Sequence, residues 1–167
     1  TPPTSRRILP FKILAMNENA QQKLAGIEEE LRANLASPRQ DTLGFLDNTL
    51  ARLREIPLSI EPSRRVECFL SIAQQFYHQG QSVFSAVEPA ALAVMVAADS
   101  GNSHLHRKAL TFQGIILSQT NNPGDALLSL SEALRLAEAL NDHIAVAAVW
   151  NALGTAFYEA ALYDDAF

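Results

Sequence analysis

Cysteine is nearly absent from this 167-residue chain, and Cys68 is the only one. No disulfide can form within the chain, which suits a reducing compartment, and we expect the cytoplasm. The apolar N-terminal stretch is interrupted by Pro10 and Lys12, so it lacks the continuous hydrophobic region of a signal peptide. No uninterrupted apolar run approaches the ~18 residues of a transmembrane helix. We therefore expect no membrane span.

Basic residues are scarce after residue 65. Residues 66–167 contain three Lys or Arg and ten Asp or Glu, a net charge of −7, whereas residues 1–65 carry +2. Because an acidic surface repels a phosphate backbone, we expect no nucleic-acid partner. The seven glycines are scattered and form no phosphate-binding loop.

Strand-forming residues are few compared with alanine and leucine, which dominate the 48% of apolar residues. Alanine and leucine favour helices, whereas valine, isoleucine and threonine favour strands. This composition predicts an all-α fold with a sizeable core, and it excludes intrinsic disorder.

The second half of the chain repeats with a period of forty residues. Gly114 and Gly154 are one period apart, and residues 93–102 align with residues 133–142. Each period contains two runs of apolar residues at helical spacing, with turn residues between them. Two full repeats and a partial third therefore share one register.

Turn residues set the expected helix boundaries. Asn122 is expected to cap a helix that starts at Pro123. Ser85 and Glu88 have the spacing of a capping box, which places Pro89 in a first turn. The pattern predicts helices at 63–79, 83–99, 104–120, 123–140 and 143–160, with another beginning near Tyr163. Because that last helix is incomplete, we expect the chain to be part of a longer protein.

One motif resembles a known family. The run Trp150-x-x-Leu153-Gly154-x-x-Phe157, followed by Ala166, is similar to the signature of tetratricopeptide repeats (TPRs). The resemblance covers about residues 63–167. Its long period is similar to that of kinesin light chains, MalT-like activators and bacterial signalling proteins, where such repeats often precede a GGDEF diguanylate cyclase, kinase or DNA-binding domain. The preceding period matches the signature at Gly114, Leu117, Ala126, Leu130 and Ala133.

This resemblance implies a right-handed α-solenoid of antiparallel helix pairs with a concave face. Small residues at Gly114, Ala126 and Gly154 would let neighbouring helices approach closely. Bulky substitutions such as Ala126→Phe or Gly154→Leu are then expected to destabilise the fold.

Residues 1–62 do not carry the signature and are expected to form a separate N-terminal segment ahead of the array at 63–167. Apolar residues at helical spacing in 20–36 and 41–56 predict a helical hairpin. It is either a cap or degenerate repeat, or a dimerising helix pair. The leading residues, Thr1–Phe11, are alternatively a linker to another domain.

The resemblance implies a binding groove for a protein or peptide partner on the concave face. Three stripes of side chains, one from the first helix of each repeat, are expected to lie side by side there, and an ordinary solvated face is the alternative. The stripes are Cys68, Ser71, Gln75 and His78; Lys108, Thr111, Ile115 and Ser118; and Asn151, Thr155 and Tyr158.

Catalytic chemistry finds little support in the sequence. His104 and His106 point to different sides of a helix, and no third ligand joins them at metal-binding spacing. Cys68 has no neighbouring histidine to activate it. We expect no catalytic or metal site and no cofactor.

The expected role is protein interaction or sensing within a larger bacterial signalling protein. A small-molecule or peptide sensor would need a closed apolar pocket. A helical dimerisation scaffold is a third reading. The packing faces around Trp150, Leu153 and Phe157 lack part of their cover, so homo-oligomers through this C-terminal edge or the N-terminal hairpin are also expected.

Overall fold

A computed structural model describes residues 8–79 and 83–165, with side chains described for 11–79 and 83–162. These residues form helices and no strands, which confirms the predicted all-α class. A 3₁₀ turn, η1 (Val83–Ala86), precedes the fourth helix. The α-helices are α1 (Ile8–Ala36), α2 (Thr42–Arg54), α3 (Pro62–Gln79), α4 (Val87–Ser100), α5 (Ser103–Gln119), α6 (Pro123–Ala139) and α7 (His143–Asp165).

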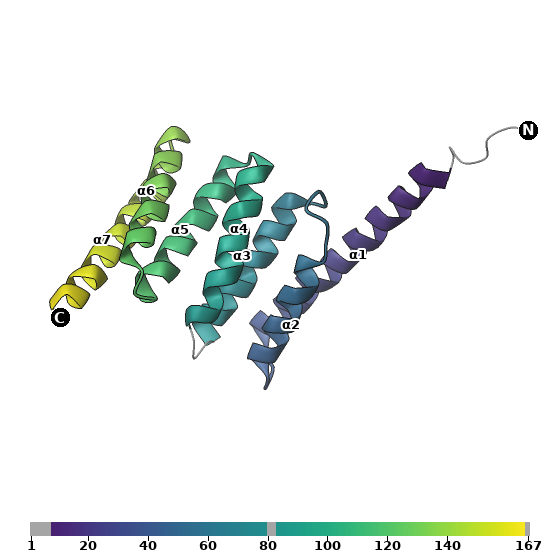
Figure 1. Cartoon of the computed structure of the whole chain (residues 1–167), viewed down its shortest axis with the longest axis horizontal. Coiled ribbons are helices and arrows are strands. Elements are labelled where there is room, and N and C mark those ends of the chain that lie inside the picture. The colour runs from purple at the N-terminus through teal and green to yellow at the C-terminus, as the bar shows by residue number, and fades with distance from the viewer. Residues whose placement is uncertain (1–7, 80–82, 166–167) are drawn as a thin grey trace, which may run out of the picture.

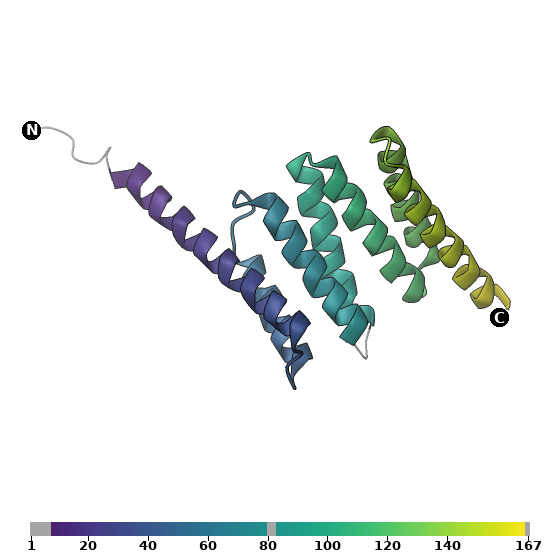
Figure 2. The ribbon, with the colours of Figure 1, turned by 180° about the vertical axis from the view of Figure 1, so that it is seen from behind.

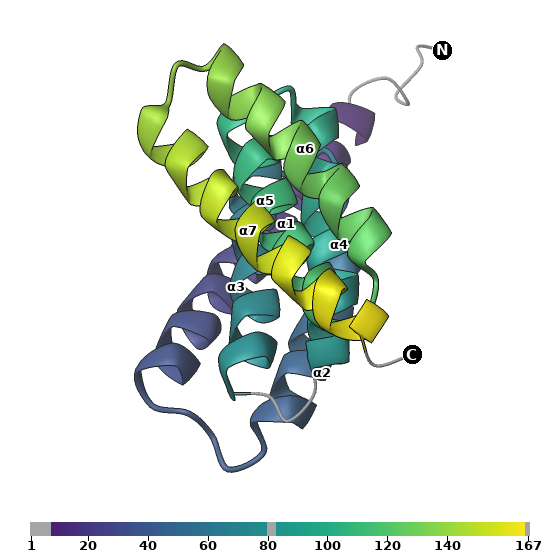
Figure 3. The ribbon, with the colours of Figure 1, turned by 90° about the vertical axis from the view of Figure 1, so that its left-hand side faces the viewer.

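The helices are arranged in a row that follows their order in the sequence (Figures 1 and 2). Each helix contacts the next one, and the odd-numbered helices also contact one another in series, α1 with α3, α3 with α5 and α5 with α7. Figure 3 looks onto the α6–α7 end of this row. The N-terminal half of α1 projects away from the other helices (Figure 1).

Three turns between successive helices use the same chemistry at twenty-residue intervals. Each contains a residue in the left-handed region, a conformation that glycine and asparagine adopt most readily. The next residue is Asn or Asp, whose side-chain oxygen accepts a hydrogen bond from the first turn of the following helix. The left-handed residues are Gly101 (φ 69°), Asn121 (φ 58°) and Asn141 (φ 53°), and the capping residues are Asn102, Asn122 and Asp142.

The predicted boundary at Asn122 is confirmed, because its Oδ1 accepts from the amide of Asp125 and α6 starts at Pro123. Pro89 lies in the first turn of α4, as predicted. The predicted capping box is wrong. Ala86 is the N-cap and makes no side-chain cap bond, and Glu88 accepts a hydrogen bond from Arg54 of α2 at 2.6 Å.

Two helices are longer than the sequence pattern predicted. α1 begins at Ile8, well before the predicted start at residue 20, and α7 runs through Tyr163 to Asp165, where a new helix was predicted. Residues 155–165 contain no proline, glycine or asparagine, so nothing in this segment interrupts the helix.

The core consists of two apolar clusters. The first extends from Ala20 in α1 to Ile116 in α5 and so continues across the predicted boundary at residue 62. The second joins α5, α6 and α7 around Leu130 and Val149, both fully buried. The hairpin and the repeats therefore share one packed row.

The predicted close helix crossing is present at Gly114 but not at Gly154. A Cβ atom on Gly114 would overlap the side chain of Leu130 and lie 3.3 Å from the carbonyl oxygen of Ala126, so α5 and α6 approach closely there. Apart from the neighbouring backbone of α7 itself, no heavy atom of the described residues lies within 4 Å of the corresponding position on Gly154. The expectation that Gly154→Leu would clash with a neighbouring helix is therefore wrong among the residues that the structure describes.

Two segments are long and apolar enough to cross a membrane by length and composition alone, Val83–Ser100 and His143–Leu162. Core helices of soluble proteins satisfy the same criterion. In this structure the first packs between α3 and α5, and the second packs against α5 and α6.

Candidate binding surface

The three predicted stripes lie on α3, α5 and α7, which are neighbours in the row. Their members differ in accessibility. His78, Lys108, Asn151, Thr155 and Tyr158 are exposed; Ser71, Thr111 and Ile115 are half-buried; Cys68, Gln75 and Ser118 are buried.

The α3 stripe is largely covered because α1 packs against it. Gln75 is 1% exposed and donates to the carbonyl oxygen of Leu31 at 3.1 Å. Its Oε1 accepts from Nδ2 of Asn34, also buried, at 2.7 Å. Gln75 therefore joins α3 to α1 and does not face a groove, contrary to the prediction from the sequence. Ser118 likewise donates within its own helix, to the carbonyl oxygen of Ile115 at 2.8 Å.

Asn34 is a structural partner that the sequence reading missed. It continues the buried face formed by Leu24, Ile27 and Leu31. A buried polar residue on an apolar helix face needs a hydrogen-bond partner. The position of Asn34 on that face could therefore have indicated a buried contact with another helix. The partner lies 41 residues away, so the sequence alone did not identify it.

Cys68 is 3% exposed and belongs to the apolar core. Burial raises the pKa of its thiol to about 12, and the charge of Glu28 adds to the increase. Because the thiolate is the reactive form, the protonated Cys68 is a packing residue and not a nucleophile near neutral pH.

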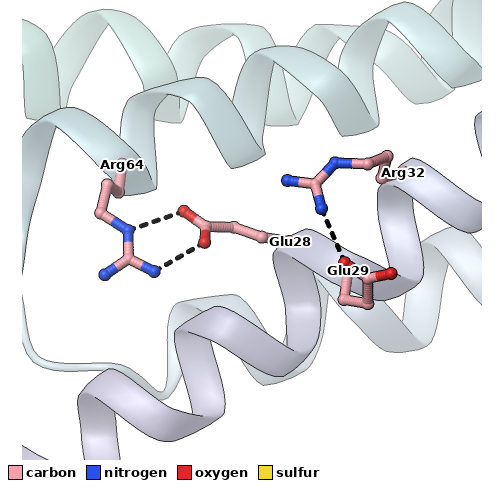
Figure 4. A network of polar contacts seen from close by, with 4 residues as sticks. All are labelled: Glu28, Glu29, Arg32 and Arg64. Carbon is pink, nitrogen blue, oxygen red and sulfur yellow. Dashed lines mark hydrogen bonds and ion pairs between the residues drawn. The ribbon is translucent and has the colours of Figure 1, made fainter.

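Two bidentate ion pairs hold the C-terminal half of α1. Arg64 of α3 donates to both carboxylate oxygens of Glu28 at 2.8 and 2.6 Å (Figure 4). Arg52 of α2 donates to Glu30 at 2.7 and 3.2 Å. The hydrogen bonds from these arginines lower the pKa of both glutamates. The pairs are partly exposed, so each contributes about 1 kcal/mol or less, but their geometry fixes the position of α1.

A hollow of about 290 Å³ opens between α1 and α3. Leu31, Leu35 and Cys68 provide apolar lining, and Leu35 is 62% exposed. Charged side chains surround it: Glu28, Arg32 and Glu67. Of the predicted groove residues, Cys68 and Ser71 line this hollow.

Lys108 lies beside the hollow and is paired. Its Nζ donates to both carboxylate oxygens of Glu67 at 3.0 and 2.8 Å, linking α5 to α3. The next helix contributes Asn151, Thr155 and Tyr158, and Tyr158 is 64% exposed. The accessible part of this face therefore combines an apolar hollow, a paired cation and an uncovered aromatic ring. We call the accessible members of the three stripes the odd-helix face: Ser71, His78, Lys108, Thr111, Ile115, Asn151, Thr155 and Tyr158.

Among the side chains that the structure describes, no three His, Cys, Asp or Glu residues gather closely enough to hold a metal ion. A comparison with models of known protein families found no match, and a search of curated proteins found none.

Proposed function

We propose that this chain is a TPR-type right-handed α-solenoid whose odd-helix face binds a protein or peptide partner. The forty-residue register, the serial contacts of the odd-numbered helices and the repeated turn chemistry support this architecture. By the same resemblance, the module belongs to a larger, cytoplasmic signalling protein of bacteria.

The main support for binding is Tyr158 of α7, an aromatic ring that is 64% exposed. Aromatic side chains contribute strongly to protein interfaces, because they bury a large area at little entropic cost. The side-chain amide of Asn151 and the hydroxyl of Thr155, on the same helix, could bind the backbone of a peptide. The Thr155 hydroxyl donates to the carbonyl oxygen of Asn151 at 3.1 Å.

The test is a selection of random displayed peptides on the whole chain, followed by affinity measurements. Asn151→Ala combined with Tyr158→Ala is expected to weaken the selected peptides at least about tenfold. Leu128→Ala on α6, an exposed apolar residue at 71%, is the matched control and should leave affinity unchanged. Equal affinity for the double variant and the wild type would place the interface elsewhere.

A dimerisation scaffold is the second candidate, and one observation favours it. The N-terminal half of α1 carries apolar side chains with no described partner helix, at Phe11, Ile13, Leu14 and Met16, which are 54–74% exposed. Light scattering would detect a dimer, and Leu14→Glu with Ile13→Glu should dissociate it.

A further inference from the structure

Arg107, in the second turn of α5, is a cation that forms no ion pair with the residues that the structure describes. Its side chain is half-buried, and its Nε is enclosed by protein atoms without a hydrogen-bond acceptor. The terminal nitrogens, Nη1 and Nη2, are not enclosed in this way. Each carries N–H groups that can donate, so the guanidinium has donors available to a ligand.

Cations are scarce in this part of the chain. Residues 66–167 contain three Lys or Arg residues, namely Arg107, Lys108 and Arg135. The Nζ of Lys108 donates to Glu67 at 3.0 and 2.8 Å, and Arg135 is paired with Glu132 of its own helix at 2.6 Å. The positive charge of Arg107 is therefore the one of the three that no described carboxylate neutralises.

Two other arginines lack a carboxylate partner, but both differ from Arg107. Arg39 lies over the ring of Phe45 at 4.2 Å, and Arg65 lies over the ring of Phe69 at 5.7 Å. Arg65 is also only 1% exposed, so a ligand does not reach it. Among the described arginines, Arg107 is the accessible one with neither a carboxylate nor an aromatic ring beside it.

The forty-residue register explains why Arg107 lacks a partner. In the preceding period Glu67 of α3 is bound by Lys108 of α5. One period later, Arg107 takes the position of Glu67, and Ala148 of α7 takes the position of Lys108. Ala148 is exposed, and its methyl group accepts no hydrogen bond. The contact between α5 and α7 therefore has a lone cation where the contact between α3 and α5 has a complete ion pair.

The residues around Arg107 belong to the odd-helix face. Lys108 and Thr111 follow it within about one turn, and the Thr111 hydroxyl donates to the carbonyl oxygen of Arg107 at 2.8 Å. Glu67 also lies at this face, but Lys108 already neutralises its charge. A guanidinium binds a carboxylate through two parallel hydrogen bonds, which are stronger than those to neutral acceptors. A carboxylate is therefore the complementary ligand at this position.

We propose that Arg107 binds a carboxylate of the peptide that occupies the odd-helix face. This inference rests on the proposed function, since it names the chemistry of the partner of that face. The carboxylate belongs either to an Asp or Glu side chain or to the C-terminus of the peptide, because both present the same pair of oxygens.

The test uses a peptide selected on the whole chain from random sequences displayed with a free C-terminus. The peptide is synthesised as selected, with its Asp and Glu replaced by Asn and Gln, and with its C-terminus amidated. The form that lacks the bound carboxylate should bind at least about tenfold more weakly by calorimetry, and the other form should bind as the selected peptide does. The comparison identifies the source of the carboxylate.

Arg107→Gln in the chain should weaken the selected peptide by a similar factor. The variant should bind the peptide that lacks the carboxylate as the wild type does, because both changes remove the same pair. Arg135→Gln on α6 also removes one arginine from this half of the chain, and it is the matched control that should leave affinity unchanged. Melting curves check that both variants fold.

Two results would overturn the inference alone. One is unchanged binding by all forms of the peptide, and the other is affinity losses that multiply when the peptide change and Arg107→Gln are combined. In either case the proposed function stands if Asn151→Ala with Tyr158→Ala still weakens binding.

The proposed function fails alone if Arg107 and the carboxylate are coupled but that double variant binds normally. The absence of any peptide that binds the chain would overturn both.

Discussion

Gly114 and Gly154 occupy the same position in successive repeats but have different surroundings. A side chain on Gly114 would overlap Leu130, whereas Gly154 faces open space among the described residues. We expect Gly114→Ala to destabilise the chain by about 1–3 kcal/mol through overpacking. Gly154→Ala should stabilise it by about 0.5–1 kcal/mol, because alanine is the better helix former.

Urea unfolding of the two variants and the wild type tests this contrast. If the two substitutions change the free energy of unfolding equally, α6 does not cross α5 closely at Gly114.

Cys68 gives a prediction for pH. Its thiol has a pKa of about 12 in the folded chain and an ordinary value near 9.0 when unfolded. Between these values the unfolded chain loses the thiol proton while the folded chain keeps it, so stability falls as pH rises through this window. Below pH 9 both states are protonated, and the effect is absent.

The measurement is the free energy of unfolding at pH 8.0 and 10.5 for the wild type and Cys68→Ala. The other titrating groups are shared, so the wild type should lose more stability than the variant over this interval. The same loss in both would show that Cys68 is accessible to water.

At the scale of helices, the docking of α1 on α3 depends on the buried pair of Asn34 and Gln75. Gln75→Leu would leave Asn34 without its acceptor, and we expect a cost of about 1–3 kcal/mol. Gln74→Leu changes the exposed neighbour on the same helix and should alter stability by less than about 0.5 kcal/mol.

Thermal and urea unfolding of these two variants distinguish a docked α1 from an independent one. If Gln75→Leu lowers the free energy of unfolding no more than Gln74→Leu does, α1 does not cover α3. The α3 stripe would then be accessible to a partner.

The sequence predicted helix positions well where the signals are local. The start of α6 follows from Asn122 and Pro123, which act within one turn of themselves. The extension of α7 was not predicted, because the sequence analysis expected a new helix near Tyr163, where no residue breaks the helix. The start of α1 was missed because Pro10 was interpreted only as a break in the apolar stretch, although proline is tolerated in the first turn of a helix.

The candidate site was predicted only in part for a similar reason. Helical periodicity identified the exposed side chains of α7, including Asn151 and Tyr158. It could not show that α1 covers Cys68 and Gln75, since that contact joins residues about forty apart whose register depends on packing.

At the scale of the whole molecule, the odd-helix face runs along the row of helices, because α3, α5 and α7 contact one another in series. In the proposed function a peptide partner binds this face and not the surface formed by the even-numbered helices.

Amide NMR spectra of the chain, recorded during titration with a peptide selected on it, identify the helices that the peptide contacts. We predict chemical-shift changes at Lys108, Asn151 and Tyr158, with Met95 of α4 and Leu128 of α6 unchanged. Changes centred on Met95 and Leu128, with the odd-helix face unaffected, would place the peptide on the even-numbered helices and contradict the proposed function.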